Sequence, residues 1–182
     1  SKGATGKIPA HVWLHCEYLQ VDGGKMSKSL GNTYTISQLK EKGISPLAFK
    51  LFCFTAHYRN KLNFTFEGAY GAQKALERLY DSYVKNANGA DEIEESIISE
   101  YKEKFSNYIN DDMNMPGAMS VVWEIARNTK KSKSFAELLL EFDKVLGLDI
   151  KNAEQYLKEF KQENEELPDD IKDLITERNK AR

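Results

Sequence analysis

Apolar and polar residues alternate in the second half of the segment 11–21, a pattern that predicts a β-strand. The residues from Asp22 to Gly24 end this strand, because adjacent glycines favour a turn. A loop is expected from Gly24 through Asn32, with Gly31 and Asn32 as a turn signal at its far end. The chain therefore opens with a short strand-plus-loop segment.

Every segment after this loop is predicted to be helical, and the later ones have apolar residues three or four positions apart, the spacing of an amphipathic helix. The segment 47–56 is apolar on most sides and is expected to be buried. Thr35 and Gln38 form a capping box at the start of the first helix, which Gly43 ends. Ser45 and Pro46 suit the N-cap and the first position of the next helix. The later apolar stripes are Ala72, Ala75, Leu76, Leu79, Tyr80 and Tyr83; Ile93, Ile97, Tyr101, Phe105 and Tyr108; Val121, Val122 and Ile125; and Phe135, Leu138, Leu139, Phe142 and Leu146.

Caps and breaks divide these later helices. Gly89 is the expected break after the first stripe, and Asn114 caps a helix that has Pro116 in its first turn. Ser134 and Glu137 form a second capping box, which predicts the start of the helix with the fourth stripe.

The last part of the chain is also expected to be helical. Gly147 ends the helix with the fourth stripe, a weaker helix surrounds Tyr156 and Phe160, and another starts at Pro168. Short amphipathic helices joined by short loops must share a core to be stable. The predicted fold class is therefore mainly α: a short strand-plus-loop segment, a helical connector to residue 64, and an antiparallel α-helical bundle.

The composition is that of a soluble globular protein, with 41% apolar and 30% charged residues. No apolar run approaches the roughly 18 to 20 residues of a membrane helix, and the first residues lack the apolar core of a signal peptide. We therefore expect a cytoplasmic protein without membrane contact. Cys16 and Cys53 have no partners at metal-ligand spacing, which predicts reduced thiols and no metal site. His11 and His15 lie four residues apart in the predicted strand and are expected to be structural.

Charge is distributed unevenly along the chain. Residues 1–88 contain 12 Lys and Arg against 6 Asp and Glu, a net charge of +6, whereas residues 89–182 contain 14 against 22, a net charge of −8. A basic half joined to an acidic half fits a polyanion that meets the first half. Two solvated surfaces that happen to differ in charge would give the same numbers, and both interpretations stay open.

The string DGGKMSKSLGN concentrates phosphate-binding chemistry in one loop. Its glycines let backbone amides approach a ligand closely, and Lys25 and Lys28 supply mobile positive charges. The hydroxyls of Ser27 and Ser29 can donate to the same phosphate oxygens, while Met26 is expected to pack the loop down. Such a loop suits a pyrophosphate whose charge grows as it leaves. The alternative is a polar surface loop with two exposed lysines.

This string resembles the lysine-rich signature of class I aminoacyl-tRNA synthetases, and the wider stretch WLHCEYLQVDGGKMSKSLGNTYTI resembles cysteinyl-tRNA synthetase. The lysine loop marks the class, whereas His57-Tyr58-Arg59 and the segment 111–116 favour cysteine. Lys61 stands where that family often has proline, and Met115 where it often has threonine. The segments similar to that family are 55–59, 62–64, 75–80, 111–116 and 177–182.

The resemblance implies a cysteine–tRNA ligase: ATP-dependent activation of cysteine, followed by transfer to tRNA(Cys). It implies Lys28 as the main ATP contact and Lys25 as its support, both of them catalytic. Ser27, Ser29 and Met26 complete the expected ATP-binding set.

The resemblance also implies two domains. Residues 1–64 would be the end of a catalytic domain, with the lysine-rich ATP loop and a connector of the stem-contact type. Residues 65–182 would be a tRNA-binding bundle of the anticodon-binding type, truncated at its C-terminus. The nucleotide-binding half and the zinc site of the family have no counterpart in this sequence, so we expect them upstream of Ser1. We predict a monomeric fragment that is inactive alone, with zinc in the full-length enzyme but no zinc ligands in this chain.

Two other functions stay open: a cysteine ligase paralogue that acts on a small amine, and a non-catalytic tRNA-binding or interaction module. Individual side chains also have two interpretations. His57 and Arg59 either contact the acceptor stem of tRNA or satisfy carbonyls at a helix end. Asp111 and Asp112 are expected to act as caps before a helix N-terminus, where negative charge is favourable. Trp123 is either an exposed platform for a base or, as we expect, partly buried.

Overall fold

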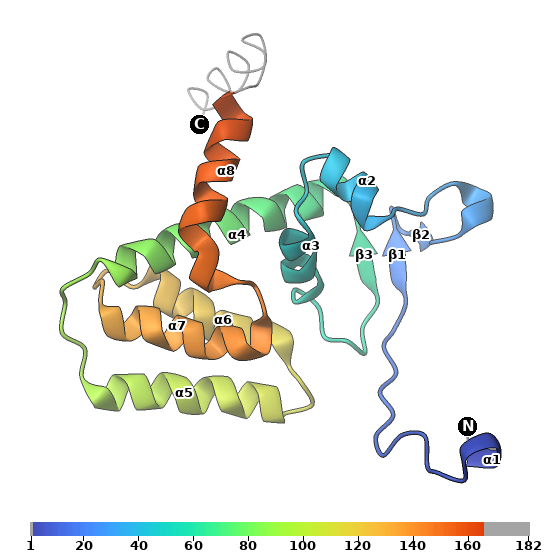
Figure 1. The fold of residues 1–182 in the computed structure, drawn as a ribbon, viewed down its shortest axis with the longest axis horizontal. Coiled ribbons are helices and arrows are strands. Elements are labelled where there is room, and N and C mark those ends of the chain that lie inside the picture. The colour runs from blue at the N-terminus through green and yellow to red at the C-terminus, as the bar shows by residue number, and fades with distance from the viewer. Residues whose placement is uncertain (1, 166–182) are drawn as a thin grey trace.

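The computed structural model describes residues 2–165, except for the side chains of Lys28 and of residues 161–165. A small β-sheet lies at one end of the molecule and a helical bundle at the other (Figure 1). None of the described helices is long and apolar enough to cross a membrane. The helix expected from Pro168 and the segment 177–182 lie outside the described residues.

The sheet has three short strands in the order β2-β1-β3. β1 pairs antiparallel with β2 and parallel with β3, so that Val21 lies opposite both Gly24 and Phe64. The strands are β1 (Leu19–Val21), β2 (Gly24–Lys25) and β3 (Leu62–Phe64).

A helical crossover joins β1 to its parallel neighbour β3, as parallel pairing requires. Its caps are those that the sequence predicts. The Thr35 side chain accepts from the Gln38 amide and the Gln38 side chain binds back, which completes the capping box. The Ser45 side chain accepts from the Ala48 amide, with Pro46 at the first helical position. The crossover contains the 3₁₀-helix η1 (Lys28–Leu30) and the helices α2 (Ile36–Glu41) and α3 (Pro46–Cys53).

Helix α4 (Phe66–Ala87) runs from the sheet into the bundle (Figure 1). Its 22 residues make it about 33 Å long at about 1.5 Å per residue. Leu76, Leu79 and Tyr80 are fully buried on its inner face, where the sequence places an apolar stripe. The remaining bundle elements are α5 (Glu95–Asn110), α6 (Met115–Arg127), α7 (Lys133–Leu146), the 3₁₀-helix η2 (Ile150–Asn152) and α8 (Ala153–Glu165).

One hydrophobic core connects the two ends of the molecule. It extends from Val21 and Phe64 in the sheet, through Leu76 of α4, to Ile125 and Phe135 in the bundle. The predicted fold class, mainly α with a short strand-plus-loop segment and a helical bundle, is confirmed.

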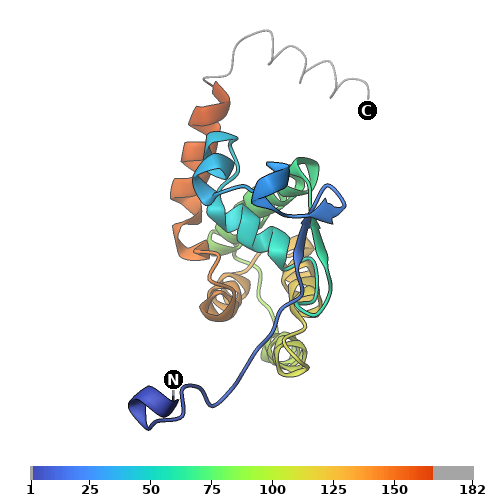
Figure 2. The ribbon, with the colours of Figure 1, turned by 90° about the vertical axis from the view of Figure 1, so that its right-hand side faces the viewer.

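The strand predicted over 11–21 is wrong for most of its length. Only Leu19–Val21 is a strand, because the preceding residues run away from the body of the molecule beside no other strand (Figure 2). Their apolar side chains are exposed, Val12 by 83% and Tyr18 by 80%. A strand needs neighbours for its N–H and C=O groups, and alternation in the sequence does not supply them. The short helix α1 (Lys2–Thr5) precedes this arm.

Pairing with β1 also explains two strands that the sequence does not predict. β2 lies in the expected loop, and β3 lies where only helix is expected. Each has no more than three residues, too few for a periodicity to be visible.

Two helical details are corrected. Ile97 and Tyr108, each 37% exposed, lie off the buried face of α5. This helix buries Phe105, as the stripe predicts, and Ile98 in place of Ile97. Ser132, and not Ser134, caps α7. The capping box fails because the cap is set by tertiary contact: the buried side chain of Asn86 accepts from the Ser132 amide at 3.1 Å.

Candidate functional site

The lysine loop begins at a tight hairpin between β1 and β2. Asp22 and Gly23 form its two-residue turn with φ of 48° and 78°, the positive values that a type I′ turn requires. β3 fixes this turn from the side: the Gly23 amide donates to Asn63 Oδ1 at 2.7 Å, and the Asp22 amide donates to the Phe64 carbonyl at 3.0 Å. The start of the loop is thus attached to the sheet through both backbone and side chain.

Asn32 closes the loop at its other end. Its Oδ1 accepts from the Ser27 amide at 2.8 Å, and its Nδ2 donates to the Lys25 carbonyl at 3.1 Å. Gly31 has φ of 66°, which brings Asn32 back toward the start of the loop. One side-chain amide therefore joins two backbone groups that flank Met26.

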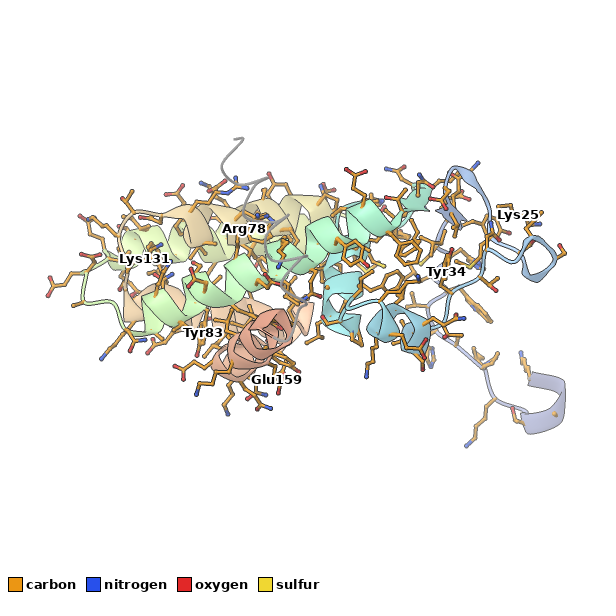
Figure 3. All side chains as sticks on the ribbon, turned by 90° about the horizontal axis from the view of Figure 1, so that it is seen from above. Lys25, Tyr34, Arg78, Tyr83, Lys131 and Glu159 are labelled. Atoms are coloured by element: carbon orange, nitrogen blue, oxygen red, sulfur yellow. The ribbon has the colours of Figure 1, made fainter. Side chains whose placement is uncertain are left out.

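Apolar contacts hold the base of the loop against the core. Met26 is partly buried and packs against the core, which confirms the packing role that the sequence predicts. Beyond the loop, the ring of Tyr34 packs at 5.8 Å from Phe64 and at 5.0 Å, edge to face, from Phe66. Figure 3 shows Tyr34 toward the body of the molecule and Lys25 further out on the loop.

The loop carries positive charge and hydroxyl groups at its surface. Lys25 is exposed, and the backbones of Lys28 and Ser29 form the first turn of η1. The hydroxyls of Ser27 and Ser29 lie 3.1 Å apart, and the Leu30 amide donates to the Ser27 carbonyl and hydroxyl. No acidic residue lies between Gly23 and Asn32. This arrangement can bind a phosphate group through ammonium, hydroxyl and backbone donors.

A second cluster joins the connector before β3 to the turn between α5 and α6. Arg59 donates to the Asp112 carboxylate through Nε at 2.6 Å and through Nη2 at 3.1 Å. The Tyr58 hydroxyl donates to the same carboxylate at 2.6 Å, and His57 Nε2 lies 3.0 Å from the Asp112 carbonyl. We call these four residues the Asp112 clamp. The two motifs that the resemblance to cysteinyl-tRNA synthetase rests on, 57–59 and 111–116, therefore meet in space.

The clamp corrects the role expected of Asp112. Asn114 caps α6 by accepting from the Gly117 amide. Asp112 and Met113 both have φ of 53°, and this left-handed turn directs the Asp112 carboxylate to Arg59 instead of to the helix start. The Arg59 and Tyr58 hydrogen bonds lower the pKa of Asp112 to about 2. His57 does meet a backbone carbonyl, as one of its two interpretations predicts; its contact with tRNA stays a prediction.

The other candidate residues lie apart from the loop. His11 is exposed on the N-terminal arm, and Cys16 and Cys53 are free thiols. The side chains that the structure describes contain no group of three His, Cys, Asp or Glu placed to hold a metal ion. The zinc that the family resemblance implies therefore has no fitting ligand set in this part of the chain. Trp123 is partly buried against the core, as expected.

The sequence indicates Asn32 only as part of a turn and gives Asn63 no role in the loop, so the hydrogen bonds by which their side chains shape the loop were missed. The available signal for the hairpin was the Asp22-Gly23 pair, since Asp-Gly is a strong two-residue turn sequence. No signal marks Asn63, because its contact with Gly23 spans 40 residues.

Comparison with known proteins gives two family matches. Residues 1–74 match the tRNA synthetases class I (C) catalytic domain, and residues 104–151 match the DALR domain. The lysine loop lies in the first match, and most of α5 to α7 lies in the second.

Curated relatives match along the whole chain. The cysteine–tRNA ligase of Legionella pneumophila (strain Corby) is 41% identical over 186 residues, which cover 100% of this chain and 39% of the relative. Cysteine–tRNA ligase 1 of Burkholderia lata is 33% identical, covering 100% and 36%. The cysteine–tRNA ligase of Actinobacillus pleuropneumoniae serotype 5b is 39% identical, covering 98% and 39%. The chain thus spans about two fifths of the length of these relatives. Both family models match in chain order, and nearly the whole of this chain aligns to a part of each relative, so the chain belongs to the cysteinyl-tRNA synthetase family.

Proposed function

We propose that this chain supplies the ATP-phosphate loop and tRNA-binding helices of a cysteine–tRNA ligase, which activates cysteine with ATP and transfers it to tRNA(Cys). The lysine loop carries the proposal: two lysines and two hydroxyls without an acidic residue, on a hairpin fixed to β3. A loop fastened at both ends holds its donors in place before the reaction, which is how charge stabilisation accelerates a reaction.

In the proposed activation step, a carboxylate oxygen of cysteine attacks the α-phosphorus of ATP. The bond between that phosphorus and the oxygen bridging to the β-phosphate breaks, and pyrophosphate leaves with the bonding electron pair. Lys28, supported by Lys25, neutralises the charge that develops on pyrophosphate, and Ser27 and Ser29 donate to its oxygens. Met26 packs the base of the loop against the core, and we assign it to the ATP-binding set for that reason.

In the proposed transfer step, a terminal hydroxyl of tRNA(Cys) attacks the activated carbonyl and AMP leaves. We assign the loop and connector to residues 1–64 and the tRNA-binding bundle to residues 65–182. The match of residues 104–151 to the DALR domain supports tRNA binding by the bundle. We further propose that the protein acts as a monomer in the cytoplasm.

The test is Lys28→Ala in the full-length gene product, followed by cysteine-dependent ATP–pyrophosphate exchange. Loss of one such donor lowers rates by about 10²–10³, and we expect this in kcat with little change in the KM for cysteine. Lys40→Ala is the matched control, since Lys40 is an exposed lysine of α2 outside the loop. Exchange at the wild-type rate in Lys28→Ala would show that the loop does not act on pyrophosphate.

Two further assays separate the alternatives. Cysteine attached to tRNA(Cys) supports the ligase, whereas attachment to a small amine in its place supports the paralogue. The 182-residue chain alone is expected to show no exchange, because it spans about two fifths of the length of the relatives that it matches. It is also expected to hold no stoichiometric zinc, because its described side chains provide no metal ligand set. Exchange by the isolated chain would refute its dependence on other parts of the protein.

A further inference from the structure

A groove on the bundle is separate from both the lysine loop and the Asp112 clamp. It lies mainly between α4 and α6, next to the end of α3, and has a volume of about 820 Å³. This size is within the roughly 300–1,000 Å³ typical of ligand sites. The groove exists because α4 presents small side chains here: Gly68, Gly71, Ala72 and Ala75.

The charge of the groove opposes that of its surroundings. Its lining contains four basic residues, Arg78, Lys85, Arg127 and Lys131, and one acidic residue, Asp81. The segment 89–182, which supplies two of these cations, has a net charge of −8. A local excess of positive charge on an acidic domain indicates a negatively charged ligand.

Two of the cations are available for such a ligand. Lys85 is paired with Asp81, and Lys131 donates to the backbone carbonyls of Asn128 and Ala126. Arg78 and Arg127 are exposed, and among the side chains that the structure describes no carboxylate pairs with either guanidinium.

The groove also offers an aromatic face beside this charge. Trp123 lines it, and the Arg127 guanidinium carbon lies 6.0 Å from the Trp123 ring centroid. Buried Met119 and Ala72 add apolar surface. Unpaired bases stack on aromatic rings and on guanidinium planes, while arginines bind the flanking phosphates. A peptide of acidic residues alone would use the arginines but has no flat ring to place against the tryptophan.

Helix α8 does not cover this face of α4. It packs on the other side, where the rings of Tyr80 and Tyr156 stack at 5.5 Å. Figure 3 shows Arg78 and Lys131 on one side of the bundle and Tyr83 and Glu159 on the opposite side.

We infer that the α4–α6 groove binds unpaired nucleotides of an RNA, with one base against Trp123 and neighbouring phosphates on Arg78 and Arg127. This inference rests on the proposed function, since it assigns a part of the bundle to the proposed tRNA partner. A fully paired RNA keeps its bases stacked inside the helix and cannot fill the groove in this way.

The experiment uses the fluorescence of Trp123 in the 182-residue chain. The sequence has two tryptophans, and Trp13 is 71% exposed on the N-terminal arm, so Trp13→Phe leaves Trp123 as the reporter. A short unstructured RNA is expected to quench this emission with a salt-dependent affinity. A fully paired RNA of the same length and polyglutamate are expected to quench it little.

Variants then assign the contacts by a labelled-RNA binding titration. Arg78→Ala and Arg127→Ala should each reduce the slope of log affinity against log salt by about 0.7. Trp123→Leu should weaken binding about 5- to 150-fold, the range for one stacked base. Lys144→Ala is the charge-matched control, because Lys144 is exposed on α7 outside the groove lining.

Arginine variants that bind RNA as the Lys144→Ala control does would overturn the inference. Equal quenching by polyglutamate would also overturn it and would indicate an acidic polypeptide as the ligand. Failure here is distinct from failure of the proposed function: the groove variants are read by RNA binding, the Lys28→Ala variant by cysteine activation. If only one of these two sets of variants has its expected defect, the conclusion tested by the other set is wrong.

Discussion

The side chain of Asn32 provides the sharpest test of how the lysine loop is held. Asn32→Ala removes the hydrogen bond that the Ser27 amide donates to Oδ1 at 2.8 Å and the one that Nδ2 donates to the Lys25 carbonyl at 3.1 Å. Each such bond contributes about 0.5–1.5 kcal/mol net, so the ordered loop should lose about 1–3 kcal/mol relative to opened states. The fold should survive, because Asn32 lies outside the hydrophobic core.

Hydrogen exchange at the Ser27 amide measures this loss directly. When opening is fast and reversible, a loss of about 1–3 kcal/mol speeds exchange about 5- to 150-fold. Asn88→Ala is the matched control, since Asn88 also donates from Nδ2 to a backbone carbonyl, that of Val84, at the far end of α4. It should leave the Ser27 amide unchanged. Equal exchange at Ser27 in Asn32→Ala and wild type would refute the idea that this side chain orders the loop.

Two further predictions concern stability. Arg59 and Tyr58 lower the pKa of Asp112 to about 2. The clamp therefore contributes fully to folding stability above the ordinary carboxyl pKa of about 4 and loses that contribution as pH falls toward 2. The difference in urea midpoint between wild type and Asp112→Asn should narrow over this pH range, and a constant difference would contradict the assignment. A Cβ on Gly89 would lie only 2.1 Å from the Lys131 carbonyl oxygen, so Gly89→Ala should destabilise the fold by about 1–3 kcal/mol or more. Gly71 lies within α4 with nothing within 4 Å of the position of a Cβ, so Gly71→Ala should stabilise the fold by about 0.5–1 kcal/mol. Chemical unfolding gives the change in the free energy of unfolding for each glycine variant. A change of the same sign in both would show that the space around the Cβ does not determine the effect.

Helix starts were predictable wherever the cap is a local interaction. Thr35 with Gln38, Ser45 and Asn114 each bond to an amide three residues ahead, so the sequence contains both partners. Ser132 differs because it is fixed by Asn86, 46 residues away, and a local capping box at Ser134 could not compete.

Strands were predictable only in part, because a strand exists through its neighbour. Residues 11–18 have an apolar pattern but no neighbouring strand, whereas Leu62–Phe64 has little pattern and pairs with β1. The same limit applies to the face of α5, where adjacent Ile97 and Ile98 are equally apolar and only packing selects Ile98.

The candidate site divides in the same way. Its charged and hydroxyl groups are contiguous in the sequence, so their chemistry was visible from Lys25 through Ser29. The side chains that hold the loop and the bundle in place lie far along the chain. Arg59 and Asp112 are 53 residues apart, and the sequence identifies both motifs without indicating that they meet.

The segment 57–64 joins the arm, the hairpin and the bundle. Near its start, Arg59 binds Asp112 in the turn between α5 and α6, and the Tyr58 carbonyl accepts from the Glu17 amide on the arm at 2.8 Å. At its end, Asn63 accepts from the Gly23 amide at the hairpin that carries the lysine loop.

Only three residues separate Arg59 from Asn63, so a displacement of the turn between α5 and α6 must bend this segment, break the Arg59–Asp112 pair, or move the hairpin. Under the proposed function, bending of the segment or breakage of the Arg59–Asp112 pair would leave the phosphate loop unaffected by RNA binding on the bundle. Movement of the hairpin would instead transmit RNA binding to the phosphate loop. Asp112→Asn distinguishes these cases, because it weakens the attachment at the bundle while the contact between Asn63 and Gly23 remains. If the segment connects the two sites, this variant should lower charging of tRNA(Cys) more than it lowers cysteine activation.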